Sequence, residues 1–377
     1  MHVEKDCYKS MLLSNLAEAF LVRLKTRKRK PIKPATLAIF SSYIRNHINP
    51  RIGALEVESI QNKQLKEFAE ALVAKDLAPK TCHEMVALVQ KIIKSAEDES
   101  GNTLFVRNWN REFILENVAD VREQRQPVCT KELLREAMKV RQANTDKYRV
   151  IVALLAASGS RIGELLALRC GDDGGHSGWD HKNSLLTIRT SLWRSQEQKP
   201  KTPSSIRVVD LATPVNEMLQ AYAEASCKNP GDYLFATRNG TAFTAHGLHK
   251  QALVPLCIPG FHSLRRWRVS HLKMVGTPEP LLKAWIGHSN GNDITSRYDR
   301  STEDKEWRQT WANKCGIGFD LPEMVGSART TSSRRTKSKI THTLLEPSTE
   351  KVSSYQASDD DLPAMLFEPP TESAGQA

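Results

Sequence analysis

The most constraining feature of this sequence is the spacing of apolar residues in its N-terminal part. Within residues 13–100 they recur every three or four positions, as Leu16, Phe20 and Leu24 do. This period is typical of amphipathic helices, which bury their apolar faces against one another. Four such segments follow each other here, so we predict a small helical bundle over residues 1–100.

A basic segment separates the first two predicted helices. It lies before Pro34, a residue type favoured in the first turn of a helix. A positive run of this kind can contact DNA phosphates, or it can be an ordinary solvated loop. We list it as a candidate DNA-binding segment, which consists of Arg27, Lys28, Arg29, Lys30 and Lys33.

The rest of the chain divides into three parts of different character. Residues 101–127 mix Asn, Arg and Glu with little periodicity, which predicts a linker. Residues 128–317 contain the strongly apolar stretch Val150–Ala157, which predicts a buried helix in a larger domain. Ser, Thr, Pro and charged residues dominate residues 318–377, so we expect a disordered tail.

One part of the larger domain gives a convincing β signal. Leu185–Arg189 and Ile206–Leu211 are short and rich in branched residues, and a polar, proline-containing stretch joins them. Such a pair predicts an antiparallel hairpin with a long, mobile loop. The expected fold class is therefore mainly α with a small antiparallel β-sheet.

Composition narrows the class of partner. Lys and Arg number 54 against 43 Asp and Glu, which gives a net charge of +11. The C-terminal segment 320–377 is itself net acidic, so the rest of the chain is more basic than the total suggests. A positive field of this kind favours polyanions such as DNA or RNA.

The arrangement of the cysteines and the absence of a long apolar run together indicate the cellular compartment. The cysteines are dispersed without a CxxC spacing, which favours reduced thiols over a disulfide framework or a zinc site. No apolar run approaches the ~20 residues that a membrane-spanning helix needs. We therefore expect a soluble, cytoplasmic protein with no membrane partner.

Five short segments carry the candidate chemistry. The guanidinium of arginine offers planar, paired donors that match the oxygens of a phosphate, so the arginines of these segments are candidate phosphate ligands. His262 and Arg265 share one helix face and can point at the same phosphate. Glu164 lies three residues after Arg161 on the same helix face, where its carboxylate can hold the arginine in a fixed orientation. The segments are Ser158–Leu168, Lys199–Val209, His262–Arg265, Ile286–Ser289 and Thr295–Tyr298.

In this order and in these local contexts, the five segments resemble the tyrosine recombinase, or phage integrase, family. The resemblance covers nearly the whole ordered chain. It implies a helical, SAM-like core-binding domain over residues 1–100 and a catalytic domain over residues 128–317. It further implies that Tyr298 is the nucleophile and that a lysine of the hairpin loop is the general acid. Lys201 is our choice for that acid, with Lys199 as the alternative.

The catalytic set that the resemblance implies is therefore Arg161, Lys201, His262, Arg265, His288 and Tyr298, with Glu164 beside it. The implied activity is site-specific recombination or integration of double-stranded DNA through a 3′-phosphotyrosyl intermediate, without metal, cofactor or ATP. Members of the family act as homotetramers on paired DNA sites. Two alternatives are a relaxing enzyme of the type IB topoisomerase kind and a catalytically silent DNA-binding protein of this fold.

Three further features of the sequence bear on how the second domain packs. Arg266–Arg268 stands where many relatives carry a histidine and small residues, which leaves the packing there open. Asp172–His181 contains His and Asp at irregular spacing, for which we predict a flexible turn and no metal site. Trp307 and Trp311 follow Tyr298 and can dock on a neighbouring protomer or pack on their own domain.

Overall fold

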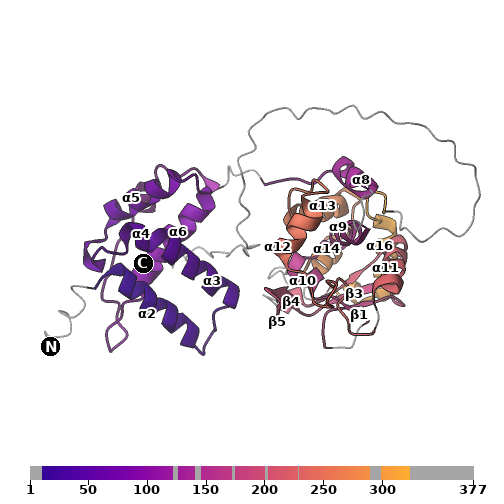
Figure 1. Ribbon diagram of the computed structural model, residues 1–377, viewed down its shortest axis with the longest axis horizontal. Helices are drawn as coiled ribbons and strands as arrows, with labels where there is room; N and C mark the ends of the chain where they lie inside the picture. Colours follow the sequence, from indigo (N-terminus) through magenta and orange to yellow (C-terminus); the bar gives the residue numbers. More distant parts are fainter. Residues whose placement is uncertain are drawn as a thin grey trace, which may run out of the picture. The chain divides into compact units, whose positions relative to one another are not determined.

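The chain forms two compact units, Met1–Arg125 and Gln126–Ala377 (Figure 1). Each unit has its own apolar core. The computed structural model describes residues 11–121, 126–140, 146–171, 175–199, 203–227, 229–288 and 299–322.

The first unit is built from helices, as the apolar spacing predicts. Leu16 and Phe20 are buried on one face of the first helix, and Pro34 begins the second. The elements are α2 (Leu13–Thr26), α3 (Pro34–Tyr43), the π-helical turn η1 (Ile44–Ile48), α4 (Asn49–Ile52), the 3-10 turn η2 (Val57–Ser59), α5 (Asn62–Val73), α6 (Pro79–Lys94) and α7 (Arg111–Ile114).

The predicted linker over residues 101–127 is wrong in its extent. Leu104, Phe105 and Trp109 pack against the core of the first unit, and Ile114 is part of that core. Most of this segment is a loop, so its apolar residues do not recur with a helical period. Periodicity alone therefore does not reveal that they are part of the first unit.

The second unit surrounds a central helix. This helix, α9 (Asp146–Ser158), contains the apolar stretch Val150–Ala157 and is buried from Arg149 to its end. The other helices are α8 (Lys131–Lys139), α10 (Ile162–Leu166), α11 (Thr213–Ser226), α12 (Ala245–Leu248), α13 (Phe261–Met274), α14 (Glu279–Ile286) and α16 (Lys305–Cys315), with the short turns η4 (Pro203–Ser205), η5 (His249–Leu253) and η6 (Ser301–Glu303).

The predicted hairpin is present within a larger sheet. Strands β3 (Leu185–Ile188) and β6 (Arg207–Asp210) pair antiparallel, with Leu185 opposite Asp210. The sheet has the strand order β1-β2-β3-β6, and it includes β1 (Arg169–Cys170) and β2 (Gly178–Asp180). Strand β2 corrects the flexible turn that we predicted across Asp172–His181. A second hairpin, β4 (Ser191–Trp193) with β5 (Gln196–Gln198), occupies the first part of the predicted mobile loop.

Two further predictions are corrected in the second unit. Phe319 is buried in the core of the second unit and Leu321 packs against that core, so the expected disordered tail does not begin at residue 318. Cys170 and Cys227 form a disulfide that joins β1 to the end of α11, which contradicts the prediction of reduced thiols. Sequence spacing gave no sign of this pair because 57 positions separate the two cysteines.

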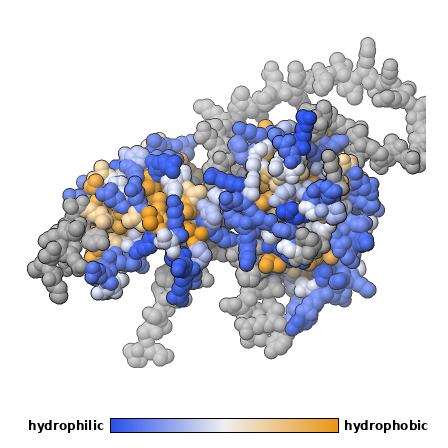
Figure 2. Space-filling model, turned by 60° about the horizontal axis from the view of Figure 1, so that its bottom comes forward, coloured by the Kyte–Doolittle hydropathy of each residue, from blue (hydrophilic) through white to orange (hydrophobic). Residues whose placement is uncertain are grey.

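The faces of the two units that are visible in Figure 2 differ in polarity. Figure 2 shows hydrophilic residues over most of the visible face of the second unit, whereas apolar residues gather on that of the first. Val22 and Val106 are among the exposed apolar side chains of the first unit. Within the described residues, no helix combines the length and apolar character needed to span a bilayer.

Close packing of α10 against β4 yields a stability prediction. A Cβ atom at Gly163 would lie 2.6 Å from Ser191 Oγ and 2.7 Å from the Leu192 carbonyl oxygen. We expect Gly163→Ala to lower the free energy of unfolding by about 1–3 kcal/mol, because an overpacked site must shift its backbone. Urea unfolding would measure this. Gly260→Ala is the control, since nothing lies within 4 Å of a Cβ there, and equal midpoints for the two variants would contradict the prediction.

Candidate active site

The turn between α9 and α10 brings Arg161 to the site. Gly159 has a φ of +65°, and a Cβ atom there would lie 2.6 Å from the Ile286 side chain, so both conformation and space require glycine. The tight turn places Arg161 at the N-cap of α10. The turn at Gly159 thus positions Arg161 close to the end of α14.

Glu164 holds Arg161 through two hydrogen bonds. The Arg161 amide donates to Glu164 Oε2 at 2.9 Å, and Arg161 Nη1 donates to Oε1 at 2.8 Å. The Glu164 side chain is 3% exposed, whereas that of Arg161 is 40% exposed. The predicted contact is therefore present, and it fixes one side of a guanidinium that still faces solvent.

Arg207 is the residue that sequence reasoning missed. It lies on β6, and its side chain donates from Nη2 to Glu164 Oε2 at 2.7 Å and from Nε to the Trp285 carbonyl at 2.7 Å. Its Nη1 donates to the Ser205 carbonyl at 3.0 Å. The residue belongs to the Lys199–Val209 segment, but we read it only as a strand position. The available signal was an arginine at the start of a short strand, directly before two valines.

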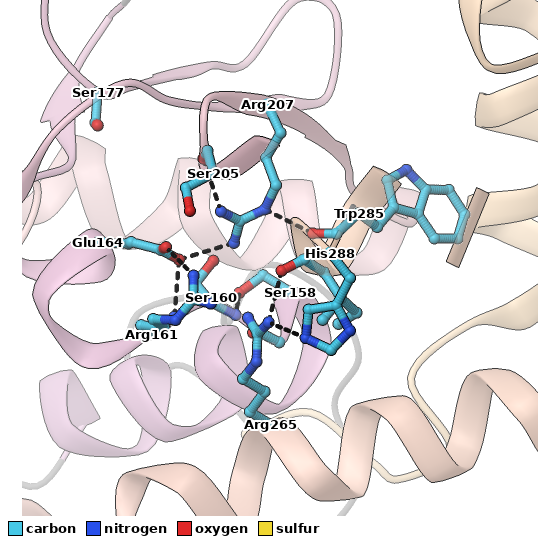
Figure 3. Close-up of polar contacts among 12 residues, drawn as sticks. Ser158, Ser160, Arg161, Glu164, Ser177, Ser205, Arg207, Arg265, Trp285 and His288 are labelled. Carbon is cyan, nitrogen blue, oxygen red and sulfur yellow. Dashed lines mark hydrogen bonds and ion pairs between the residues drawn. The ribbon is translucent and has the colours of Figure 1, made fainter. Parts of the chain in front are cut away.

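Arg265 connects the Arg161 turn to the turn after α14. From α13 it donates to the Gly159 carbonyl at 2.8 Å and to the Ile286 carbonyl at 2.6 Å. Its Nη2 also lies 3.1 Å from His288 Nε2. Figure 3 shows Arg161, Arg207 and Arg265 reaching toward one another from three separate segments, with His288 beside them. We call the three arginines the arginine cluster.

Among the residues that the structure describes, Glu164 is the carboxylate that pairs with the arginine cluster, so one negative charge faces three positive ones. Burial, followed by the charges of Arg161 and Arg207, lowers the pKa of Arg265 to about 9, which leaves it cationic at neutral pH. Burial raises the pKa of Glu164, but its hydrogen bond to Arg207 and the charges of Arg207 and Arg161 outweigh this and lower it. Burial and then Arg265 lower the pKa of His288, which favours the neutral imidazole. An anion is the ligand that such a site suits.

His262 lies at the exposed start of α13, one helical turn before Arg265. With Arg265 and His288 it lines a hollow of about 810 Å³. Much of the remaining wall is apolar and includes Val128, Trp267, Val269 and Met274. Residues of two separate candidate segments, His262 and Arg265 from one and His288 from the other, therefore line one shared hollow.

Two of the predicted site residues, Lys201 and Tyr298, lie outside the described residues. Lys199, the alternative general acid, is exposed at the end of β5. The structure thus brings together Arg161, Glu164, Arg265 and His288, and it places His262 in the adjoining hollow. The roles of Lys201 and Tyr298 stay predictions.

The candidate DNA-binding segment lies between α2 and α3 of the first unit. Arg27, Lys28, Arg29 and Lys30 are exposed, and Lys33 is half-buried at the N-cap of α3. Arg27 Nη2 donates to the Lys30 carbonyl at 2.6 Å, which bends the segment back on itself. Most of its positive side chains are therefore accessible to a phosphate backbone.

The unusual residues after Arg265 are well packed. Trp267 is buried and stacks on His271, with ring centroids 5.8 Å apart. Arg268 donates to the Gly316 carbonyl at 2.6 Å and thereby satisfies a carbonyl just past α16. Arg266 donates to the Pro127 carbonyl at 2.8 Å. The departure from the family pattern is thus accommodated by contacts within the unit.

The tryptophan pair of α16 packs on its own unit. Trp307 and Trp311 form an edge-to-face pair with centroids 6.4 Å apart, and both lie against the core of the second unit. Of the two possibilities left open by the sequence, the structure shows packing within the same domain.

In the part of the chain that the structure describes, no three His, Cys, Asp or Glu residues are grouped to hold a metal. His176 instead lies 2.8 Å from Glu197 through its Nδ1 atom. The residues between Gly171 and Gly175 lie outside the described part.

No family model and no curated protein sequence matches this chain. Among solved structures, the Tn1549 transposon integrase in complex with transposon right end DNA is similar, with a TM-score of 0.58 and 21% identity over 78% of this chain and 97% of that one. A lambda integrase dimer bound to a COC′ core site has a TM-score of 0.55 and 14% identity, covering 87% of this chain and 100% of that one. A lambda integrase tetramer bound to a Holliday junction has a TM-score of 0.56 and 16% identity, covering 77% of each chain. Both integrases are tyrosine recombinases, so the predicted resemblance and fold class are confirmed at the level of the fold.

Proposed function

We propose that this protein is a site-specific DNA recombinase or integrase that cleaves and rejoins double-stranded DNA through a 3′-phosphotyrosyl link to Tyr298. The observation that carries the proposal is the convergence of Arg161, Arg265 and His288, from three distant segments, on one positively charged site. The resemblance of the five sequence segments and the integrase fold support the same activity.

The arginines bind the phosphate whose bond is broken. In the transition state the phosphorus carries an additional oxygen and more negative charge than the ground state, and fixed donors stabilise that charge most. Arg161 presents a partly exposed guanidinium held by Glu164, and Arg265 is held by two backbone carbonyls. Both are oriented before DNA binds. His262 donates a further hydrogen bond from the edge of the hollow.

Each bond broken in the reaction is matched by one formed. The Tyr298 oxygen attacks phosphorus, the bond from phosphorus to the 5′ oxygen breaks, and Lys201 gives that oxygen a proton. His288 either accepts the tyrosine proton or hydrogen-bonds the phosphate, in which case that proton passes to water. Its lowered pKa keeps the imidazole neutral and therefore able to accept a proton. The phosphotyrosyl bond retains the energy of the broken phosphodiester. A 5′ hydroxyl of another strand can therefore reverse the step without ATP, and no metal enters the chemistry.

Strand exchange requires several protomers on paired DNA sites, and we propose a homotetramer. The similar lambda integrase forms a tetramer on a Holliday junction. We assign core DNA binding to the helical first unit. The residues that we place on the phosphate backbone are Arg27, Lys28, Arg29, Lys30 and Lys33. A cytoplasmic location is the expected one for such an enzyme.

The experiment that tests this function is covalent capture. Protein mixed with sheared DNA from its source is denatured in detergent, and the DNA that stays attached is sequenced. A recombinase enriches a short, defined site, and two copies of that site then yield exchanged products. Relaxation of a supercoiled plasmid without exchange would indicate the type IB alternative, and the absence of any attached DNA would indicate a silent DNA-binding protein.

The general acid can be assigned with a modified substrate. We expect Lys201→Ala to slow cleavage by about 10²–10⁴-fold, the usual contribution of a positioned acid. A substrate with sulfur in place of the leaving 5′ oxygen should restore most of this rate, because a thiolate leaves without a proton. Lys199→Ala is the matched control. If only Lys199→Ala is slow and rescued by sulfur, the acid is Lys199.

A further inference from the structure

Arg207 connects three of the segments that form the site. Its side chain is 4% exposed, and each of its three nitrogens donates to a protein acceptor. One acceptor is the Glu164 carboxylate, and the others are the carbonyls of Trp285 and Ser205. A buried charge with this number of partners fixes its neighbours, because moving any of them leaves a buried donor unsatisfied.

The contact with the turn after α14 is close. Gly287 has a φ of +73°, and a Cβ atom there would lie 3.0 Å from Arg207 Cδ and 3.1 Å from Arg207 Nη1. The turn therefore rests on the flat side of the Arg207 side chain. His288 is the next residue, so Arg207 supports the turn that presents the imidazole to Arg265.

The contact with Glu164 passes on to Arg161. Glu164 Oε2 accepts from both the Arg207 side chain and the Arg161 amide, while Oε1 accepts from Arg161 Nη1. Arg207 thus fixes the plane of the carboxylate, and the carboxylate fixes the Arg161 guanidinium. Without Arg207, the Glu164 carboxylate keeps only its hydrogen bonds to Arg161 itself, so Arg161 and Glu164 lose the group on β6 that fixes their direction.

We propose that Arg207 is a positioning residue for the strand-transfer reaction, which orients Arg161 through Glu164 and holds the turn that carries His288. This inference rests on the proposed function. Arg207 itself does not contact DNA, because it is buried and all three of its nitrogens are engaged. It also stands on β6, directly after the segment that contains Lys199 and Lys201.

The test compares Arg207→Gln and Arg207→Lys with Arg149→Gln in the full-length protein. Arg149 is a matched control, since it is a buried arginine of the same unit that donates to the Met138 carbonyl and pairs with Asp146. Single-turnover cleavage is measured on a nicked suicide substrate built from the captured site. DNA affinity and urea unfolding are measured beside it.

We expect Arg207→Gln to slow cleavage by about 10- to 100-fold, the usual effect of losing a group that orients a ligand-binding residue. DNA affinity should stay within about threefold of wild type, since no phosphate contact is removed. Arg207→Lys should recover part of the rate, because an ammonium can still donate to Glu164. Arg149→Gln should lower the urea midpoint and leave the cleavage rate of the folded protein unchanged. If Arg207→Gln does not fold, the cleavage rate of Arg207→Lys is compared with that of the wild type instead.

The pH profile separates positioning from a general loss of structure. Three arginines surround the Glu164 carboxylate: Arg161 at the start of α10, Arg207 on β6 and Arg265 on α13. His288 lies beside Arg265. Arg207 helps keep the pKa of Glu164 low, so cleavage that needs ionised Glu164 is lost only as pH falls through that pKa. In Arg207→Gln this pKa rises, and the acid limb of the profile should move to higher pH. Glu164→Gln has no carboxyl, so adding Arg207→Gln to it should produce no such movement.

Two results would overturn the positioning role. Wild-type cleavage rates with an unmoved acid limb in both Arg207 variants would show that Arg207 orients nothing that the reaction uses. A fall in DNA affinity as large as the fall in rate would show that Arg207 is instead a direct phosphate ligand. Failure of the wild-type protein to form any adduct is a different outcome, because it removes the proposed function on which the inference rests.

Discussion

Tyr298→Phe should bind DNA with unchanged affinity and form no covalent protein–DNA adduct. The substitution removes only the phenolic oxygen, which is the atom that attacks phosphorus in the proposed reaction. The cationic groups that hold the phosphate, Arg161 and Arg265, remain in place. Cleavage of a nicked suicide substrate, followed by a denaturing gel, measures the adduct, and a gel-shift titration measures the affinity.

Tyr148→Phe is the matched control for this experiment. Its hydroxyl donates to Gln251 at 2.7 Å, and it belongs to α9 rather than to any of the five candidate segments. It should form adduct at the wild-type rate. Undiminished adduct in Tyr298→Phe would exclude Tyr298 as the nucleophile, and peptide mapping of the attached DNA would then identify the residue that attacks.

Local patterns in the sequence were enough to predict the main elements. The helical period predicted α2 and α3, the apolar run predicted α9, and branched residues predicted the pairing of β3 with β6. Each of these signals lies within one short window of the chain. Burial of one face of a helix, or of alternate residues of a strand, leaves a pattern that can be read from a few consecutive residues.

The features that were missed depend on residues far apart in the chain. Strand β1 has two residues, and its partner β2 has three, so neither carries a readable alternation. The Cys170–Cys227 disulfide depends on where the end of α11 meets β1. Such contacts depend on the tertiary structure, so the spacing of residues along the sequence does not predict them.

The same distinction holds within the candidate site. Arg161, Arg265 and His288 stand in motifs whose local form could be recognised, and the structure places them together. Arg207 has no local motif of its own. Its partners Glu164 and Trp285 are 43 and 78 positions away, so only the folded chain reveals what it holds.

Arg265→Lys should lower the rate of adduct formation by about 10²–10³-fold, the usual effect of removing one fixed donor from a developing negative charge. Arginine can hold the Gly159 and Ile286 carbonyls through two nitrogens and still direct N–H groups toward a ligand. A lysine ammonium retains the charge but cannot satisfy both carbonyls in this geometry. The variant therefore still attracts the phosphate by its charge but no longer holds it in a fixed orientation. DNA affinity should change by no more than about threefold.

Arg266→Lys separates this effect from a general sensitivity of α13. Arg266 is the next residue on the helix, and its guanidinium donates only to the Pro127 carbonyl among the contacts of the described chain. The variant should cleave at close to the wild-type rate. Single-turnover kinetics at saturating protein give the comparison directly, because differences in affinity then drop out. If Arg265→Lys and Arg266→Lys slow cleavage equally, the charge and packing of α13 matter in general, and Arg265 holds no special place at the phosphate.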